Sequence, residues 1–89
     1  MKTTIIKAQH HPEPYDEIKL MASIYAACLA VRTPSGEAEV TAKQVAKALR
    51  PWLKGKPEVT SYDIRLRTAK LLHTYNPNAA YLYKHHGKI

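Results

Sequence analysis

The stretch that decides the fold is residues 16–31, DEIKLMASIYAACLAV. Its apolar side chains recur every three or four positions, the spacing that places them along one face of a helix. They are Leu20, Met21, Ile24, Tyr25, Cys28 and Val31. Asp16 is a preferred N-cap residue, and Glu17 is favourable in a first helical turn. The stretch therefore predicts a central helix over residues 17–31.

A second helix follows the loop at residues 32–36. It begins near Glu37, or at Thr41 with Gln44 three residues later as a capping box. Because proline breaks the regular hydrogen bonding of a helix, we expect the helix to end or kink just before Pro51. Its expected inner face consists of Val45, Ala48, Leu49, Trp52 and Leu53.

Two more helices are predicted towards the C-terminus. The third begins at a cap provided by Thr60 or Ser61. Its apolar stripe consists of Ile64, Thr68, Leu71, Leu72 and Tyr75. The fourth covers residues 77–85, because Asn76 followed by a proline is typical of an N-cap and a first helical position.

The N-terminus predicts a small β element. Residues 3–7 are rich in β-branched side chains and form a strand, and residues 13–15 can return beside it as a second. An isolated hairpin is marginal in water, so it must lie on the helices. The expected fold is mainly α (α+β), roughly a four-helix bundle covered by an N-terminal β-hairpin lid. We expect one domain over residues 1–89, with the lid in 1–15 and the bundle in 16–86.

Composition limits the class of protein. The chain has 89 residues, 45% of them hydrophobic, which suits one small globular domain. The longest nearly apolar run, residues 20–31, is too short to span a bilayer, and residues 1–10 show no secretory signal. Cys28 is the one cysteine. These features favour a cytoplasmic protein without membrane association.

The net charge of +7, from 14 Lys and Arg against 7 Asp and Glu, favours anionic partners. Nucleic acid, a nucleotide and an acidic protein surface all fit, and so does an ordinary solvated surface. Arg65, Arg67 and Lys70 lie close together on the third predicted helix. They form either a phosphate-contacting face or the solvent side of an amphipathic helix.

The residues offer little for catalysis. Ser23 has no histidine at helical spacing, and Cys28 lies on the apolar stripe, where a structural role is expected. With 3 glycines the chain has no Gly-rich phosphate loop. In each pair, His10-His11 and His85-His86, neighbouring side chains on an extended chain face opposite ways, and no further ligand completes a metal set. We therefore expect a non-catalytic binding or regulatory module, not an enzyme.

Several short motifs stand in a fixed order. They are Ile5-Ile6-Lys7, Glu13-Pro14-Tyr15-Asp16, Lys19-Leu20, Ser23-Ile24, Val59-Thr60-Ser61-Tyr62-Asp63-Ile64 and Asn78-Ala79-Ala80-Tyr81. This order resembles the ATP-cone, a regulatory nucleotide-binding domain at the N-terminus of many ribonucleotide reductases that also occurs in a bacterial repressor of reductase genes. That family opens with two hydrophobic residues and Lys-Arg-Asp-Gly, followed by Glu-Pro-Phe-Asp and by Lys with an aliphatic residue. The resemblance spans about residues 3–84.

The resemblance implies a fold and a ligand. A small β element covers about four helices, and ATP or dATP binds between them, with Mg²⁺ as an accompanying ion. Lysines of the strand and first helix reach the phosphates, a hydroxyl and a basic residue at the start of the later helix line the site, and strand backbone lies near the base. The implied nucleotide-binding residues are Ile5, Ile6, Lys7, Glu13, Lys19, Thr60, Ser61 and Arg65.

One departure leaves alternatives open. The family's Arg-Asp-Gly is Ala8-Gln9-His10 here, which removes a guanidinium and a turn glycine. The first expectation is an adenine-nucleotide-binding regulatory domain that acts on a partner protein in trans, or belongs to a longer chain. The second is a divergent copy that serves as a protein-interaction or homo-oligomerisation module without ligand. The third is a small basic nucleic-acid-binding protein.

Overall fold

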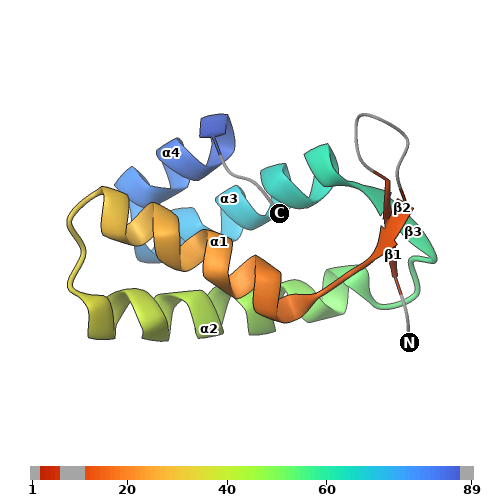
Figure 1. Ribbon diagram of the computed structural model, residues 1–89, viewed down its shortest axis with the longest axis horizontal. Helices are drawn as coiled ribbons and strands as arrows, with labels where there is room; N and C mark the ends of the chain where they lie inside the picture. Colours follow the sequence, from red (N-terminus) through yellow and green to blue (C-terminus); the bar gives the residue numbers. More distant parts are fainter. Residues whose placement is uncertain (1–2, 7–11, 87–89) are drawn as a thin grey trace.

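The computed structural model describes residues 3–6 and 12–86, and within them the chain forms four helices and three short strands. The helices are α1 (Glu17–Ala30), α2 (Ser35–Leu53), α3 (Ser61–Tyr75) and α4 (Pro77–His86). The strands are β1 (Thr4–Ile6), β2 (Pro12–Pro14) and β3 (Glu58–Thr60). The sheet lies at one end of the helices (Figure 1), which confirms the predicted class of a helical bundle with a small β lid.

The helices pack as a ring, with α1 and α3 each lying against both α2 and α4. One hydrophobic core joins them, and it receives Ile5 from β1 and Val59 from β3. The large side chains with almost no exposed surface include Leu20, Ile24, Leu49, Ile64, Leu72 and Tyr83. Burial of β1 and β3 side chains in this core attaches the lid, since a short sheet is not stable alone.

The sheet has the order β2-β1-β3. The predicted antiparallel hairpin is confirmed, with Ile5 opposite Glu13. A third strand, β3, was not predicted, and it runs parallel to β1 with Ile6 opposite Thr60. Strand β3 has three residues, of which only Val59 is buried, and this is too short for an alternation of apolar and polar residues to indicate a strand in the sequence. The parallel pairing therefore depends on the helices that bring residues 58–60 beside β1.

Helix α2 differs from the prediction at both ends. It begins at Ser35, before Glu37 and Thr41, and Thr41 is buried within it. It continues through Pro51 to Leu53, so the expected end before the proline is wrong. Pro51 lies in the last turn, where it costs a single helical hydrogen bond, and burial of Leu53 offsets that loss. Ala48 of α2 and the terminal Tyr75 of α3, both predicted to face inwards, are exposed.

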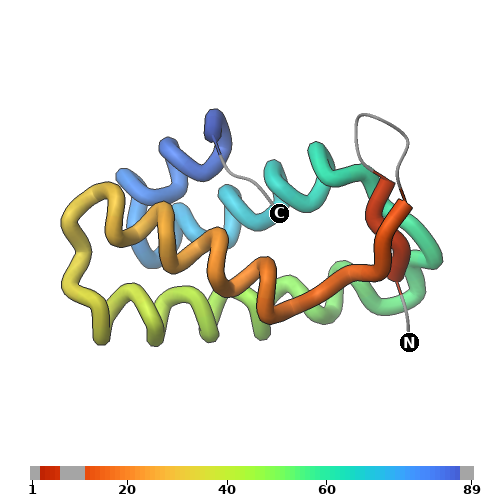
Figure 2. The backbone as a smooth tube through the Cα atoms, in the orientation of Figure 1, coloured from red at the N-terminus to blue at the C-terminus, as the bar shows by residue number. Residues whose placement is uncertain are grey.

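The predicted N-caps of α1, α3 and α4 are confirmed. Asp16 accepts hydrogen bonds from the backbone N–H groups of Ile18 (2.9 Å) and Lys19 (3.4 Å). Thr60 caps α3 by accepting from the N–H of Asp63, and Asn76 caps α4. Figure 2 shows the result: α2 ends and α3 begins on the side of the sheet, an extended segment joins β2 to α1, and the α1–α2 loop lies at the opposite end.

Candidate functional site

The candidate site lies where the sheet meets the start of α3. Parallel pairing places Ile6, the last residue of β1, opposite Thr60, the last residue of β3. Ser61 begins α3 directly afterwards, and Arg65 follows one turn later. Two of the motifs quoted above, more than 50 residues apart in the sequence, are therefore adjacent in space.

The remaining predicted residues lie in the sheet, on α1 or outside the described residues. Ile5 is in the central strand with its side chain buried in the core, and Glu13 lies opposite it on β2. Lys19 is exposed in the first turn of α1. Lys7 and the divergent residues 8–10 lie outside the described residues.

The two hydroxyls at the start of α3 are not equivalent. Thr60 Oγ1 accepts a hydrogen bond of 3.0 Å from the N–H of Asp63 and is committed to capping the helix. The half-buried hydroxyl of Ser61 makes no hydrogen bond to a described residue. Ser61 is therefore the better placed of the pair to contact a ligand.

Arg65 supplies positive charge in the second turn of α3. Its side chain is half-buried, and its guanidinium carbon lies 5.3 Å from the centre of the Tyr62 ring. Its Nε is buried without a hydrogen-bond partner among the described residues. A buried donor of a charged group that lacks an acceptor is costly. The positive charge of the guanidinium makes Arg65 the candidate for an anionic ligand.

Arg65 belongs to a group of buried and half-buried polar side chains that we name the interior polar cluster: Tyr15, Ser23, Arg65, Thr68 and Tyr83. Ser23 Oγ donates to the carbonyl of Leu20 at 2.7 Å and lies 2.9 Å from Tyr83 Oη. Since the Ser23 hydroxyl has one proton and the carbonyl takes it, the Tyr83 phenol donates to Ser23. This hydrogen bond joins α1 to α4.

The two tyrosines of the interior polar cluster are held protonated. Burial raises the pKa of Tyr83 to about 12, against the opposing effects of its Ser23 and Thr68 neighbours and the charge of Arg65. Burial also raises the pKa of Tyr15, and nearby Glu17 raises it further. Tyr15 Oη and Thr68 Oγ1 are buried without a hydrogen bond of good geometry, although Thr68 is close enough to lower the pKa of Tyr83. The cluster thus offers neutral donors beside one cation.

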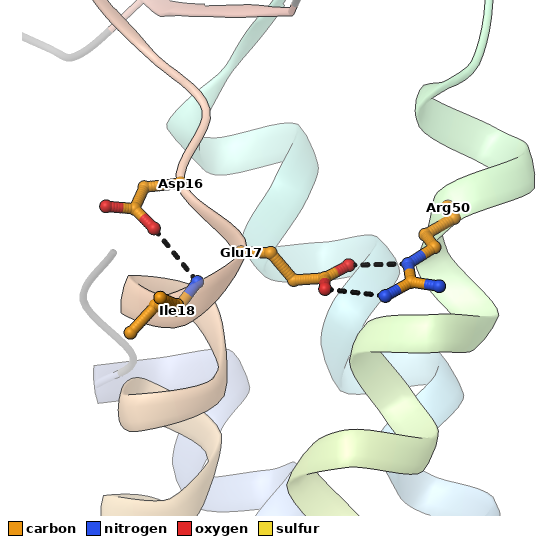
Figure 3. Close-up of polar contacts among 4 residues, drawn as sticks. All are labelled: Asp16, Glu17, Ile18 and Arg50. Carbon is orange, nitrogen blue, oxygen red and sulfur yellow. Dashed lines mark hydrogen bonds and ion pairs between the residues drawn. The ribbon is translucent and has the colours of Figure 1, made fainter.

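An ion pair fixes the entry of the chain into α1 (Figure 3). Arg50 of α2 donates to both carboxylate oxygens of Glu17, at 2.7 and 2.8 Å. The hydrogen bonds from Arg50 lower the pKa of the Glu17 carboxyl. Together with the Asp16 cap, this bidentate pair orients the first turn of α1, which carries Lys19.

Other chemistries find no support in the described residues. Cys28 is buried and burial raises the pKa of its thiol, which disfavours the reactive thiolate. Among the described side chains, no three His, Cys, Asp or Glu come together as a metal site. None of the described helices combines the length and the apolarity that crossing a bilayer requires.

Comparison with known proteins leaves the geometry as the main guide. No protein-family model matches the sequence, and a search of curated proteins finds no match either.

Sequence reasoning missed Tyr15, Thr68 and Tyr83 as candidate site residues. Each lies in or beside an apolar stripe, where a hydroxyl normally indicates a core substitution. Only the packed chain reveals that Tyr83 lies beside Thr68 and close enough to Tyr15 to affect its pKa.

Proposed function

We propose that this chain is a non-catalytic regulatory domain that binds an adenine nucleotide, ATP or dATP, between its β lid and its helices, and acts on a partner protein in trans. The observation that carries the proposal is the parallel pairing of β1 with β3. It places Ile6 opposite Thr60, directly before the start of α3, so two of the motifs that resemble the ATP-cone lie side by side.

The electrostatics of this junction support an anionic ligand. The buried Nε of Arg65, which has no hydrogen-bond partner among the described residues, lies one turn inside α3, whose N-terminus carries partial positive charge. Lys19 adds an exposed ammonium group on α1. Phosphate oxygens would accept hydrogen bonds from Arg65 and the Ser61 hydroxyl, while Lys7 and Lys19 act as point charges.

The same residues favour binding over chemistry. Hydrolysis requires a group that activates water, and the interior polar cluster holds protonated phenols and hydroxyls. Mg²⁺ would accompany the nucleotide through its phosphates, as is usual for this ion, because the described side chains form no carboxylate cluster. The ligand therefore acts by its presence, as a regulator does.

Isothermal titration calorimetry of the full chain with ATP and with dATP tests the proposal. We expect saturable binding that Arg65→Gln and the Lys7→Ala/Lys19→Ala double variant each weaken at least about tenfold, a loss of about 1.4 kcal/mol. Lys47→Ala, which removes an exposed lysine of α2, is the matched control and should bind as the native chain does. Absence of binding heat, or native affinity in Arg65→Gln, would refute the nucleotide site.

The two alternatives predict different outcomes. A ligand-free interaction module assembles equally with and without nucleotide, which light scattering after size exclusion detects. A nucleic-acid-binding protein retains DNA or RNA at low salt and loses it steeply as salt rises. Against a joint phosphate-contacting face, Arg65 lies over the Tyr62 ring and Arg67 over the Trp52 ring, and both side chains are half-buried whereas Lys70 is exposed.

A further inference from the structure

A groove runs between α3 and α4, away from the candidate nucleotide site. Its volume is about 680 Å³. The lining residues are Leu66, Ala69, Lys70, His73, Pro77, Ala80, Tyr81 and Lys84. On α3 they extend from Leu66 to His73, two helical turns or about 10 Å.

The groove has an apolar floor and a basic rim. Leu66, Ala69 and Ala80 form the floor, and they are half-buried or buried. Exposed Lys70 and Lys84 stand on the rim, one from each helix. A floor of this kind with a charged rim is typical of a surface that binds a helix in a groove.

Tyr81 is a large aromatic side chain at the groove that is mostly exposed to solvent. Its side chain is 70% exposed, although it is one of the largest apolar surfaces on α4. It lies against His85 one turn later, with ring centres 4.6 Å apart. Aromatic side chains held at the edge of an apolar groove are typical anchors of protein interfaces.

The two helices that form the groove carry charge of one sign beyond the first turn of α3. From residue 64 to residue 86 the sequence contains Arg65, Arg67, Lys70 and Lys84 and no Asp or Glu. Every acidic residue of the chain therefore precedes α3 or lies in its first turn. The field above the groove selects an acidic partner and repels basic ones.

We propose that the α3–α4 groove is a docking site for an acidic amphipathic helix of a partner protein. Apolar side chains at i, i+3 or i+4 and i+7 of that helix would cover the two-turn floor, and its flanking carboxylates would face Lys70 and Lys84. A nucleic acid would meet the lysines but leave the apolar floor uncovered. The inference rests on the part of the proposed function that requires a partner in trans, and it names that partner's chemistry.

The test uses the full chain and a fluorescent probe peptide of about three helical turns, with leucine at i, i+3, i+4 and i+7 and glutamate elsewhere. Fluorescence anisotropy should show saturable binding. A peptide of scrambled order, a peptide with lysine in place of glutamate, and a single-stranded oligonucleotide should each bind at least about tenfold more weakly. Equal binding of the scrambled peptide or of the oligonucleotide would overturn the proposal.

Substitutions locate the site. The exposed rim variant Lys70→Glu/Lys84→Glu and the variant Tyr81→Ala should each weaken peptide binding at least about tenfold. Lys47→Glu on α2 is the matched control for added negative charge and should bind the peptide as the native chain does. Unchanged binding in both groove variants would refute the groove as the site. Self-association of the chain that Lys84→Glu abolishes would also refute the proposal, because a second copy of the chain would then occupy the groove. Circular dichroism checks that each variant is folded.

ATP titration of the same variants separates the two proposals. The groove variants should bind ATP as the native chain does, while Arg65→Gln should bind the peptide normally. If the native chain binds ATP but not the peptide, the docking site alone is refuted. Absence of ATP binding with selective peptide binding sinks the nucleotide site alone.

Discussion

The hydrogen bond between Tyr83 and Ser23 provides a quantitative test of the bundle interior. Tyr83 is fully buried and donates to Ser23 Oγ at 2.9 Å, while Ser23 donates to the Leu20 carbonyl. Ser23→Ala strands the buried phenol proton, a desolvation cost of about 1–3 kcal/mol. Tyr83→Phe leaves Ser23 bonded to Leu20, so it should cost only about 1 kcal/mol, the net value of one hydrogen bond.

The double variant separates the hydrogen bond from its surroundings. With both hydroxyls removed no donor is stranded, so we expect a loss smaller than the sum of the single losses by about 1 kcal/mol. Urea unfolding followed by circular dichroism gives the three values. Tyr81→Phe, which removes an exposed hydroxyl from the same helix, is the control and should change stability by less than about 0.5 kcal/mol. Additivity of the two single losses would refute the assignment of Tyr83 as donor to Ser23.

Three further predictions concern the local structure. Asp16→Ala should lower the free energy of unfolding by about 1 kcal/mol through loss of the α1 cap, and Asp16→Asn should retain most of it; equal losses in the two would contradict the cap. Arg50 lowers the folded-state pKa of Glu17 below the ordinary value of 4.5. The stabilising contribution of the Glu17–Arg50 pair is therefore complete above pH 4.5 and declines as the pH falls through the folded-state pKa. The stability difference between the native chain and Glu17→Gln should therefore shrink in urea titrations below about pH 4.5, and a constant difference would argue against the pair. Gly55→Ala should destabilise by about 1 kcal/mol because φ is +85° there, whereas Gly36→Ala, with open space around its Cβ, should stabilise α2; thermal unfolding compares the two.

The helices were predictable because their boundaries depend on local chemistry. Asp16, Thr60 and Asn76 each begin a helix by accepting a hydrogen bond from a backbone N–H within three residues. Periodicity and capping operate over one or two turns, so a linear sequence displays them in full. The predicted boundaries of α2 were wrong because they depend on packing as well as on local chemistry. The effect of Pro51 depends on how well Leu53 packs in the core, which no local pattern shows.

The candidate site was predictable in its parts only through the motifs that resemble the ATP-cone. Composition and periodicity alone identify no ligand-binding residue among Ser61, Arg65 and Lys19. The structure adds that the Nε of Arg65 is buried and that Ser61, not Thr60, has an uncommitted hydroxyl among the described residues. These distinctions depend on exposure and hydrogen-bond partners, which are properties of the packed chain.

The sequence alone indicates a mainly helical protein and the starts of most of its helices. It also shows that the last two helices carry positive charge, with Asp63 in the first turn of α3 as their one acid. The tertiary structure decided that β3 joins the lid, that Tyr83 meets Ser23 across 60 residues, and that Lys70 and Lys84 flank one groove. The physical reason is the distance along the chain over which each interaction acts. Caps and periodicity are local interactions, whereas strand pairing, burial of hydroxyls and the shape of a groove exist only after distant segments have packed together.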